Sequence, residues 1–156
     1  MKIHNIQLNS SINIDNINLA IGNFDGLHLG HQKIIEKLIY QSNEMKLNST
    51  IMSFVPHPRQ FFCKKYDNFS IISDSMKIKL LEQMGIKNYI VLNFDHSIAS
   101  LNPEKFIELI LVKNLQIRNL VVGYDFKFGR ERKGNVSLLK KQSLIYNFTV
   151  NVLEQV

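Results

Sequence analysis

A glycine-rich stretch near the amino terminus reads Gly22-Asn-Phe-Asp-Gly-Leu-His-Leu-Gly-His31. It follows an apolar run, Ile17-Asn-Leu-Ala-Ile21, and precedes a segment in which apolar side chains recur at the spacing of one helix face: Ile34, Ile35, Leu38 and Ile39. These three parts predict a β-strand, a tight turn and an α-helix. A strand that passes through such a turn into a helix is half of a βαβ unit, so the stretch indicates an α/β fold.

The same alternation continues along the chain. Further strands are predicted over 49–54, 89–94, 120–123 and 148–153, and further helices over 74–84, 102–115 and 136–144. This order predicts a mostly parallel sheet with helices on both faces. Ligands of such sheets bind beyond the carboxyl ends of the strands, so we look for function in the turns after Ile21, Phe54 and Val122.

Length and composition are those of an ordinary folded protein. The chain has 156 residues, of which 45% are hydrophobic and 21% charged, which excludes a disordered, collagen-like or coiled-coil chain. We expect one domain over residues 1–156. Cys63 is the single cysteine, and no apolar run has the length of a signal-peptide core or a membrane span. We therefore expect a cytoplasmic protein with no membrane partner.

Most of the net charge of +6 lies between residues 127 and 141. A local basic cluster of this kind suggests an anionic partner, either a polyphosphate or a nucleic acid. The alternative is a solvated loop and helix face. Nucleic acid is not the partner we expect, and strong salt dependence of oligonucleotide binding would be its mark.

His28 and His31 lie near the amino end of the first predicted helix. Helix amino termini attract phosphate through free N–H groups and partial positive charge. Two imidazoles would add hydrogen-bond donors, and a bound polyphosphate would favour their charged form. Gly22, Gly26 and Gly30 permit tight turns and a close approach of the ligand. The alternatives are an exposed pair without a role, a pair that caps the turn, and zinc ligands with no obvious third ligand nearby.

Three motifs carry a resemblance to a known family. They are Gly-x-Phe-Asp-Gly-x-His-x-Gly-His over 22–31, Phe54-Val-Pro-His-Pro58, and Gly123-Tyr-Asp-Phe-Lys-Phe-Gly129 with Arg132 and Gly134. In order and spacing they resemble the adenylyltransferase half of bacterial FAD synthetases, the bifunctional riboflavin kinase/FMN adenylyltransferases. The resemblance covers residues 15 to 155.

This resemblance implies a Rossmann-like nucleotidylyltransferase fold and the reaction of ATP with FMN to give FAD and pyrophosphate, with Mg²⁺ held by the ATP phosphates. The implied catalytic residues are His28 and His31. The implied ATP-binding residues are Gly22, Phe24, Asp25, Gly30, Asp125, Phe126 and Arg132. The implied flavin-binding residues are His57, Pro58, Phe61 and Phe62. For Asp25 the alternative is capping of the turn, and for each phenylalanine it is packing in the core.

Members of this family continue past the last strand into a Ser-Ser-Thr-x-x-Arg-like motif and then a riboflavin kinase module, whereas this sequence reaches Val156 before either. We therefore expect no kinase activity and leave a missing segment or module open. Two functions remain, an FMN adenylyltransferase and a nucleotide- or flavin-binding remnant with little turnover. A nucleotidylyltransferase with another acceptor also shares His-x-Gly-His, but the Pro-His-Pro turn and the Gly-Tyr-Asp-Phe loop favour FMN.

Overall fold

The computed structural model describes residues 1–63 and 74–154, and its centre is a parallel sheet. The strands are β1 (Lys2–Ile6), β2 (Ile17–Ile21), β3 (Asn48–Val55), β4 (Asn88–Asn93), β5 (Asn119–Gly123) and β6 (Thr149–Leu153). They lie in the order β1-β4-β3-β2-β5-β6, and every neighbouring pair is parallel. The loops that follow the strands therefore meet at one edge of the sheet.

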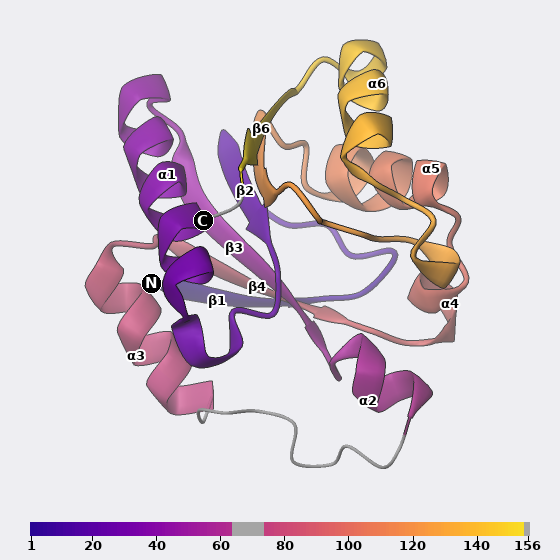
Figure 1. Ribbon diagram of the computed structural model, residues 1–156, viewed down its shortest axis with the longest axis horizontal. Coiled ribbons are helices and arrows are strands. Elements are labelled where there is room, and N and C mark those ends of the chain that lie inside the picture. The colour runs from indigo at the N-terminus through magenta and orange to yellow at the C-terminus, as the bar shows by residue number, and fades with distance from the viewer. Residues whose placement is uncertain (64–73, 155–156) are drawn as a thin grey trace.

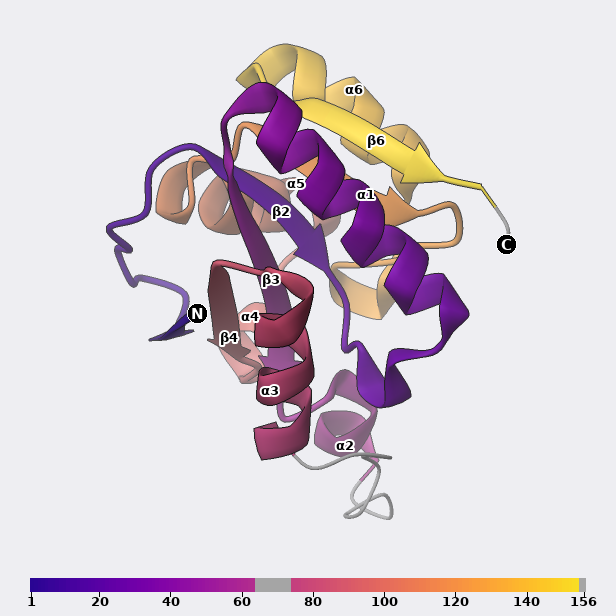
Figure 2. The ribbon, with the colours of Figure 1, turned by 90° about the vertical axis from the view of Figure 1, so that its left-hand side faces the viewer.

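Helices cover both faces of this sheet (Figure 1). Figure 2 shows α1 (Leu29–Met45) and α3 (Asp74–Met84) in front, with the chain of α5 (Pro103–Phe106) and α6 (Val136–Tyr146) behind. The remaining short elements are η1 (Asp25–Leu27), α2 (Pro58–Phe62), α4 (His96–Ala99), η2 (Ile107–Asn114) and η3 (Arg130–Arg132). Among the residues that the structure describes, no helix is long and apolar enough to cross a membrane.

The core has two layers, one on each face of the sheet. Alternate residues of β2 supply both: Ile17, Leu19 and Ile21 pack with η2 and α6, whereas Ala20 packs with α1 and α3. All five residues of β2 are buried. Burial on both faces is the usual state of a parallel sheet, and it explains why the strands read as apolar runs rather than strict alternation.

The structure confirms the predicted α/β fold and every predicted strand and helix, with shifted ends. One strand, β1, was not predicted, because only Ile6 of its five residues is buried and the sequence offers no apolar run. The helix predicted over 102–115 begins as α5 and continues as η2, which is wound as a π-helix. Phe106, Ile110, Leu111 and Leu115 are buried there, and their spacing of four and five residues suits the wider π turn.

A row of polar side chains crosses the sheet near the amino ends of three strands. Asn18 of β2 is in register with Asn119 of β5, which is in register with Thr149 of β6. Asn119 donates a hydrogen bond to Asn18 over 2.8 Å and accepts one from Thr149. Asn18 also donates to Ser42 of α1 over 3.0 Å. Asn18 and Asn119 are fully buried, so these bonds satisfy polar groups that would otherwise be costly.

Candidate functional site

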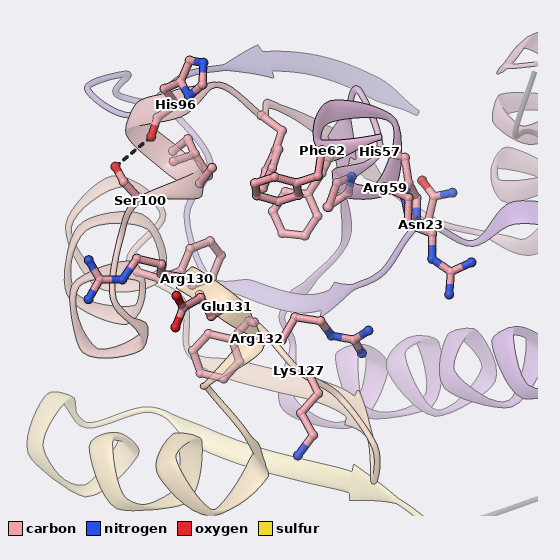
Figure 3. Close-up of a pocket in the computed structure, with 18 of the residues that line it drawn as sticks. Asn23, His57, Arg59, Phe62, His96, Ser100, Lys127, Arg130, Glu131 and Arg132 are labelled. Atoms are coloured by element: carbon pink, nitrogen blue, oxygen red, sulfur yellow. Dashed lines mark hydrogen bonds between the residues drawn. The ribbon is translucent and has the colours of Figure 1, made fainter. Parts of the chain in front are cut away.

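A cavity of about 840 Å³ opens at the carboxyl edge of the sheet. Its apolar lining comes from Phe54, Phe62, Phe94, Ile98, Phe106 and Phe128. Its charged and polar lining includes the cationic Arg59, Lys127, Arg130 and Arg132, the imidazoles of His57 and His96, and the carboxylate of Glu131. Figure 3 shows Arg132 extending toward the side of the cavity where Asn23 and Arg59 lie, whereas Arg130 points the opposite way. An apolar interior with a cationic rim suits a flat aromatic ligand that carries a phosphate.

The aromatic rings contact one another around the cavity. The Phe54 ring lies 5.6 Å from Phe94 and 6.2 Å from Phe106 between centroids. Phe62 lies 6.1 Å from Phe94, although 69% of Phe62 is exposed. Phe61 lies 5.3 Å from Phe94 and is not part of the lining. These separations are those of paired aromatic rings, so Phe61 supports the wall from behind and Phe62 is available to a ligand.

His57 begins the short helix α2. The Nδ1 atom of His57 accepts a hydrogen bond from the Arg59 backbone N–H over 3.0 Å. The backbone N–H of His57 donates to Gln60 Oε1 over 3.2 Å. Pro58 occupies the first turn, where its lack of an N–H costs nothing. Burial, Arg59 and Lys77 lower the pKa of His57 below its ordinary value, against the opposite effect of Asp25. These effects favour the neutral form of His57.

The β2–α1 loop is shaped by a buried phenylalanine. Phe24 is fully buried and has a left-handed backbone with φ 55°. A Cβ at Gly22 would lie 3.2 Å from the Phe24 ring, so the ring packs closely under this glycine. Gly26 has φ 74°, a region that favours glycine. Because Phe24 is buried, its side chain shapes the loop, and only its backbone is available to a ligand.

His28 is the N-cap of α1 and is exposed. Its Nδ1 accepts hydrogen bonds from the backbone N–H groups of Gly30 and His31, over 3.1 and 3.4 Å. A nitrogen that accepts these bonds carries no proton, so the neutral ring holds its proton on Nε2. His28 thus presents an Nε2–H donor at a helix terminus that itself favours anions.

His31 stacks on His28, with ring centroids 3.6 Å apart and planes at 21°. Burial, followed by His28, lowers the pKa of His31 from 6.5 to about 4; Asp25 acts in the opposite sense and Lys77 lowers it further. His31 Nδ1 is buried without a hydrogen-bond partner among the described residues. A proton there would lack an acceptor, so His31 is neutral at pH 7 and we place its single proton on Nε2.

The β5–α6 loop lies beside the β2–α1 loop because β5 pairs with β2. Two glycines set its path. A Cβ at Gly129 (φ 77°) would lie 2.9 Å from Pro103 Cα, and a Cβ at Gly134 would lie 2.7 Å from the Phe128 ring. The Phe126 and Phe128 rings stack 5.5 Å apart. The loop is thereby folded tightly against α5.

The structure therefore divides the predicted site residues into two neighbouring groups. Gly22, His57, Pro58, Phe62 and Arg132 line the cavity. Asp25, His28, Gly30 and His31 lie around the amino end of α1. Asp125 is exposed, and its Oδ1 would lie 3.3 Å from a Cβ at Gly123, so this carboxylate folds back over the end of β5. Phe126 is partly buried against the core. Gly22 joins the two groups, since it directly follows β2, lines the cavity and opens the loop to His28.

Several lining residues were missed by the sequence reasoning. Phe94 and His96 follow β4, and the rule that ligands bind beyond the carboxyl ends of strands applies to this strand as well. Phe106 comes from a predicted helix in which the sequence pattern indicates only core packing, and Phe128 lies in the Gly123–Gly129 motif but was not named as a site residue.

The described residues also bear on metal binding. Within 1–63 and 74–154, no three His, Cys, Asp or Glu side chains gather where they could hold a metal ion. Asp25 is close enough to raise the pKa of both His31 and His57, so a carboxylate does lie near the end of α1.

Known proteins are similar to this chain in sequence and in fold. A profile of the FAD synthetase family matches residues 11–156. A bifunctional riboflavin kinase/FMN adenylyltransferase of Buchnera aphidicola (subsp. Schizaphis graminum) is 37% identical over 95% of this chain and 46% of its own length. The proteins of that name from Haemophilus influenzae and Bacillus subtilis are 37% and 34% identical, over 85% and 78% of this chain and 43% and 38% of their own lengths. The chain thus spans less than half the length of these curated relatives.

A solved structure has the same fold. A macrolide-efflux protein from Streptococcus pneumoniae covers 100% of this chain with a TM-score of 0.86, at 22% identity and over 52% of its own length. At this identity the likeness supports the architecture alone. The family profile spans residues 11–156, which include each of the three motifs that form the site. The chain therefore belongs to the FAD synthetase family.

Proposed function

We propose that this chain transfers AMP from ATP to FMN, giving FAD and pyrophosphate. The observation that carries the proposal is the junction at Gly22 and Asn23, where an aromatic cavity meets a helix terminus that bears two imidazoles. One compartment suits a flavin ring and the other a triphosphate. Adenylyl transfer is the second of the two activities in the relatives' names.

The flavin would occupy the cavity, with its apolar rings between Phe62 and the wall of Phe54 and Phe94. His57 and Pro58 would border the ring, because they form the turn that carries α2. Phe61 would hold this wall in place through its contact with Phe94. The FMN phosphate would then point toward the junction with the α1 terminus.

ATP would bind with its phosphates at the amino end of α1. The free N–H groups of the first turn and the Nε2–H of His28 are donors for phosphate oxygens. Gly22 and Gly30 allow the phosphates to approach the backbone closely. The β5–α6 loop, with Asp125 and Phe126, would hold the nucleoside beside β5.

The reaction needs alignment and charge neutralisation rather than an enzyme nucleophile. An oxygen of the FMN phosphate forms a bond to the α-phosphorus as the bond from that phosphorus to the bridging oxygen of pyrophosphate breaks. Negative charge accumulates on the leaving pyrophosphate. His28 and His31 would donate hydrogen bonds to it, and Arg132 would add a fixed positive charge.

Magnesium would enter with ATP, and when bound it would neutralise phosphate charge. Mg²⁺ in such sites is held mainly by phosphates and water with one or two carboxylates. The donor set fits this mode, since Asp25 lies beside the imidazoles at the α1 terminus. We also propose the cytoplasm as the compartment, supported by the single cysteine of the sequence.

The test is to incubate the purified chain with ATP, FMN and Mg²⁺ and to detect FAD and pyrophosphate by mass spectrometry. The control is the double variant His28→Ala, His31→Ala. We expect FAD from the wild-type chain and a loss of at least about 100-fold in the variant. Equal FAD formation by both proteins would show that the imidazoles take no part in the reaction. If the wild-type chain forms no FAD, the proposal for this chain is contradicted.

A further inference from the structure

A charged residue is buried behind the β2–α1 loop. Lys77 of α3 is only 6% exposed, and it is the one charged side chain among the buried residues of the described chain. Removing an ammonium group from water is costly unless protein groups replace the lost hydration. Lys77 therefore requires a specific reason for its position.

Its hydrogen bond points to that reason. Lys77 Nζ donates to the backbone carbonyl of Asn23 over 3.0 Å. Asn23 lines the cavity and lies between Gly22, which directly follows β2, and Phe24, which has a left-handed backbone. The bond thus ties α3 to the point where the cavity wall becomes the loop leading to α1.

The charge of Lys77 also acts on both histidine regions. It lowers the pKa of His31, together with burial and His28, and that of His57, together with burial and Arg59. Asp25 raises both. One ammonium group therefore lies near the imidazole at the α1 terminus and near the imidazole at the cavity.

We propose that Lys77 is a positioning residue that holds the β2–α1 loop at Asn23, so that the α1 terminus and the cavity wall keep a fixed relation. The inference rests on the proposed adenylyl transfer, in which two substrates must meet at this junction. Lys77 is too buried to contact either substrate, and its effect passes through Asn23 and the neighbouring imidazoles. Small displacements of aligned groups are known to cost large factors in rate.

The first experiment compares Lys77→Met with Lys79→Met in the full chain. Methionine keeps the stem of the side chain and removes the ammonium group. Lys79 lies two positions further along α3 and is exposed, so it receives the same substitution without the contact. The readouts are kcat, KM for FMN, the unfolding temperature, and the pKa of His31 followed by NMR.

For Lys77→Met we expect kcat to fall about 10- to 100-fold and KM for FMN to stay within about twofold, as for a loss of alignment. We expect the pKa of His31 to rise from about 4, since a positive neighbour is removed. Lys79→Met should change neither. A folded Lys77→Met protein with wild-type kcat and an unchanged pKa of His31 would overturn the proposal.

If Lys77→Met does not fold, Lys77→Arg takes its place, because it retains the charge and displaces the donor. Its loop amides, residues 23–31, should exchange hydrogen several-fold faster than in the wild type, with α6 unchanged. Unchanged exchange in the loop would overturn the proposal. If the wild-type chain makes no FAD, the proposed function fails, whereas the NMR and exchange measurements still decide the role of Lys77.

Discussion

Two histidines begin two helices at the same edge of the sheet, and the helices differ in what they offer a ligand. His28 caps α1 and His57 caps α2, and in both the Nδ1 atom accepts a backbone hydrogen bond. The first helix has 17 residues and the second has five. Aligned peptide dipoles and free N–H groups make the long helix an anion site, whereas the short one mainly places side chains.

The surroundings of the His28 and His57 rings also differ, being polar for His28 and aromatic for His57. His28 is exposed and stacks on His31, so two polar rings face the terminus of α1. His57 is partly buried and lies with Pro58 and Phe62 in the lining of an aromatic cavity. Under the proposed function, the same cap would serve phosphate in one region and a flat apolar ring in the other. The chemistry of a capping histidine is set by its neighbours rather than by the cap.

The largest effect should come from removing the α1 imidazoles one at a time. His28→Ala and His31→Ala should each lower kcat about 100- to 1000-fold, because each removes a donor to the leaving pyrophosphate. Binding of FMN, followed by flavin fluorescence, should change little. His4→Ala is the control, since His4 lies on the edge strand β1. If FMN binding weakens as much as kcat falls, the division between the two regions is wrong.

A methyl group beside His28 should affect activity without harming the fold. A Cβ at Gly30 would lie 3.0 Å from His28 Cε1, so Gly30→Ala should push the ring from its capping position. We expect kcat to fall about 10-fold. Thermal stability should change little, because alanine favours a helix over glycine by about 1 kcal/mol and loss of the His28 cap costs about as much. A loss of both activity and stability would show that the glycine serves the fold instead.

Substitutions in the cavity should weaken FMN binding and leave kcat nearly unchanged. Phe62→Ala should raise the Kd for FMN about fivefold through the loss of one aromatic contact, with kcat at saturating FMN nearly unchanged. Fluorescence titration measures the Kd. Tyr40→Ala is a matched control, because Tyr40 is an aromatic residue of α1 that is 62% exposed and does not line the cavity. An equal effect of the two substitutions would argue against the flavin site.

The smallest effect concerns pH. The pKa of His31 is lowered to about 4 in the folded protein, so between pH 6.5 and 4 the unfolded chain binds a proton that the folded chain does not. The stabilising contribution is present above pH 6.5 and is lost as the pH falls toward 4. It is on the order of 1 kcal/mol, because the ring is half exposed and solvent screens it. Urea unfolding at pH 7 and 4.5 should show a larger loss for the wild type than for His31→Gln. An equal loss of the free energy of unfolding in the wild type and in His31→Gln would contradict this contribution of His31.

The fold was predictable because its signals are local. The glycine-rich turn, the apolar strands and the helix start at Asn102-Pro103 each act through neighbouring residues, and each is confirmed. The edge strand β1 was not predictable in this way, because its place depends on pairing with β4 far along the chain.

The candidate site was predictable in part for the same reason. Histidines at strand ends stand out in a sequence, and the structure places His28, His31 and His57 at the expected edge. Lys77 did not stand out, because a lysine in a predicted helix is normally solvated. Its burial arises only when α3 packs against the β2–α1 loop. A sequence motif gives no information about contacts between segments that are far apart in the chain.

The polar row of Asn18, Asn119 and Thr149 fixes the register of β2, β5 and β6. A slip of one residue would turn these side chains to the other face and leave buried amides without partners. The same number of residues separates Asn18 from Gly22 and Asn119 from Gly123. The polar row therefore also fixes the relative positions of Gly22 and Gly123, where the β2–α1 and β5–α6 loops of the site begin. Inserting one residue after the row in a single strand would offset those loops by about 3.3 Å.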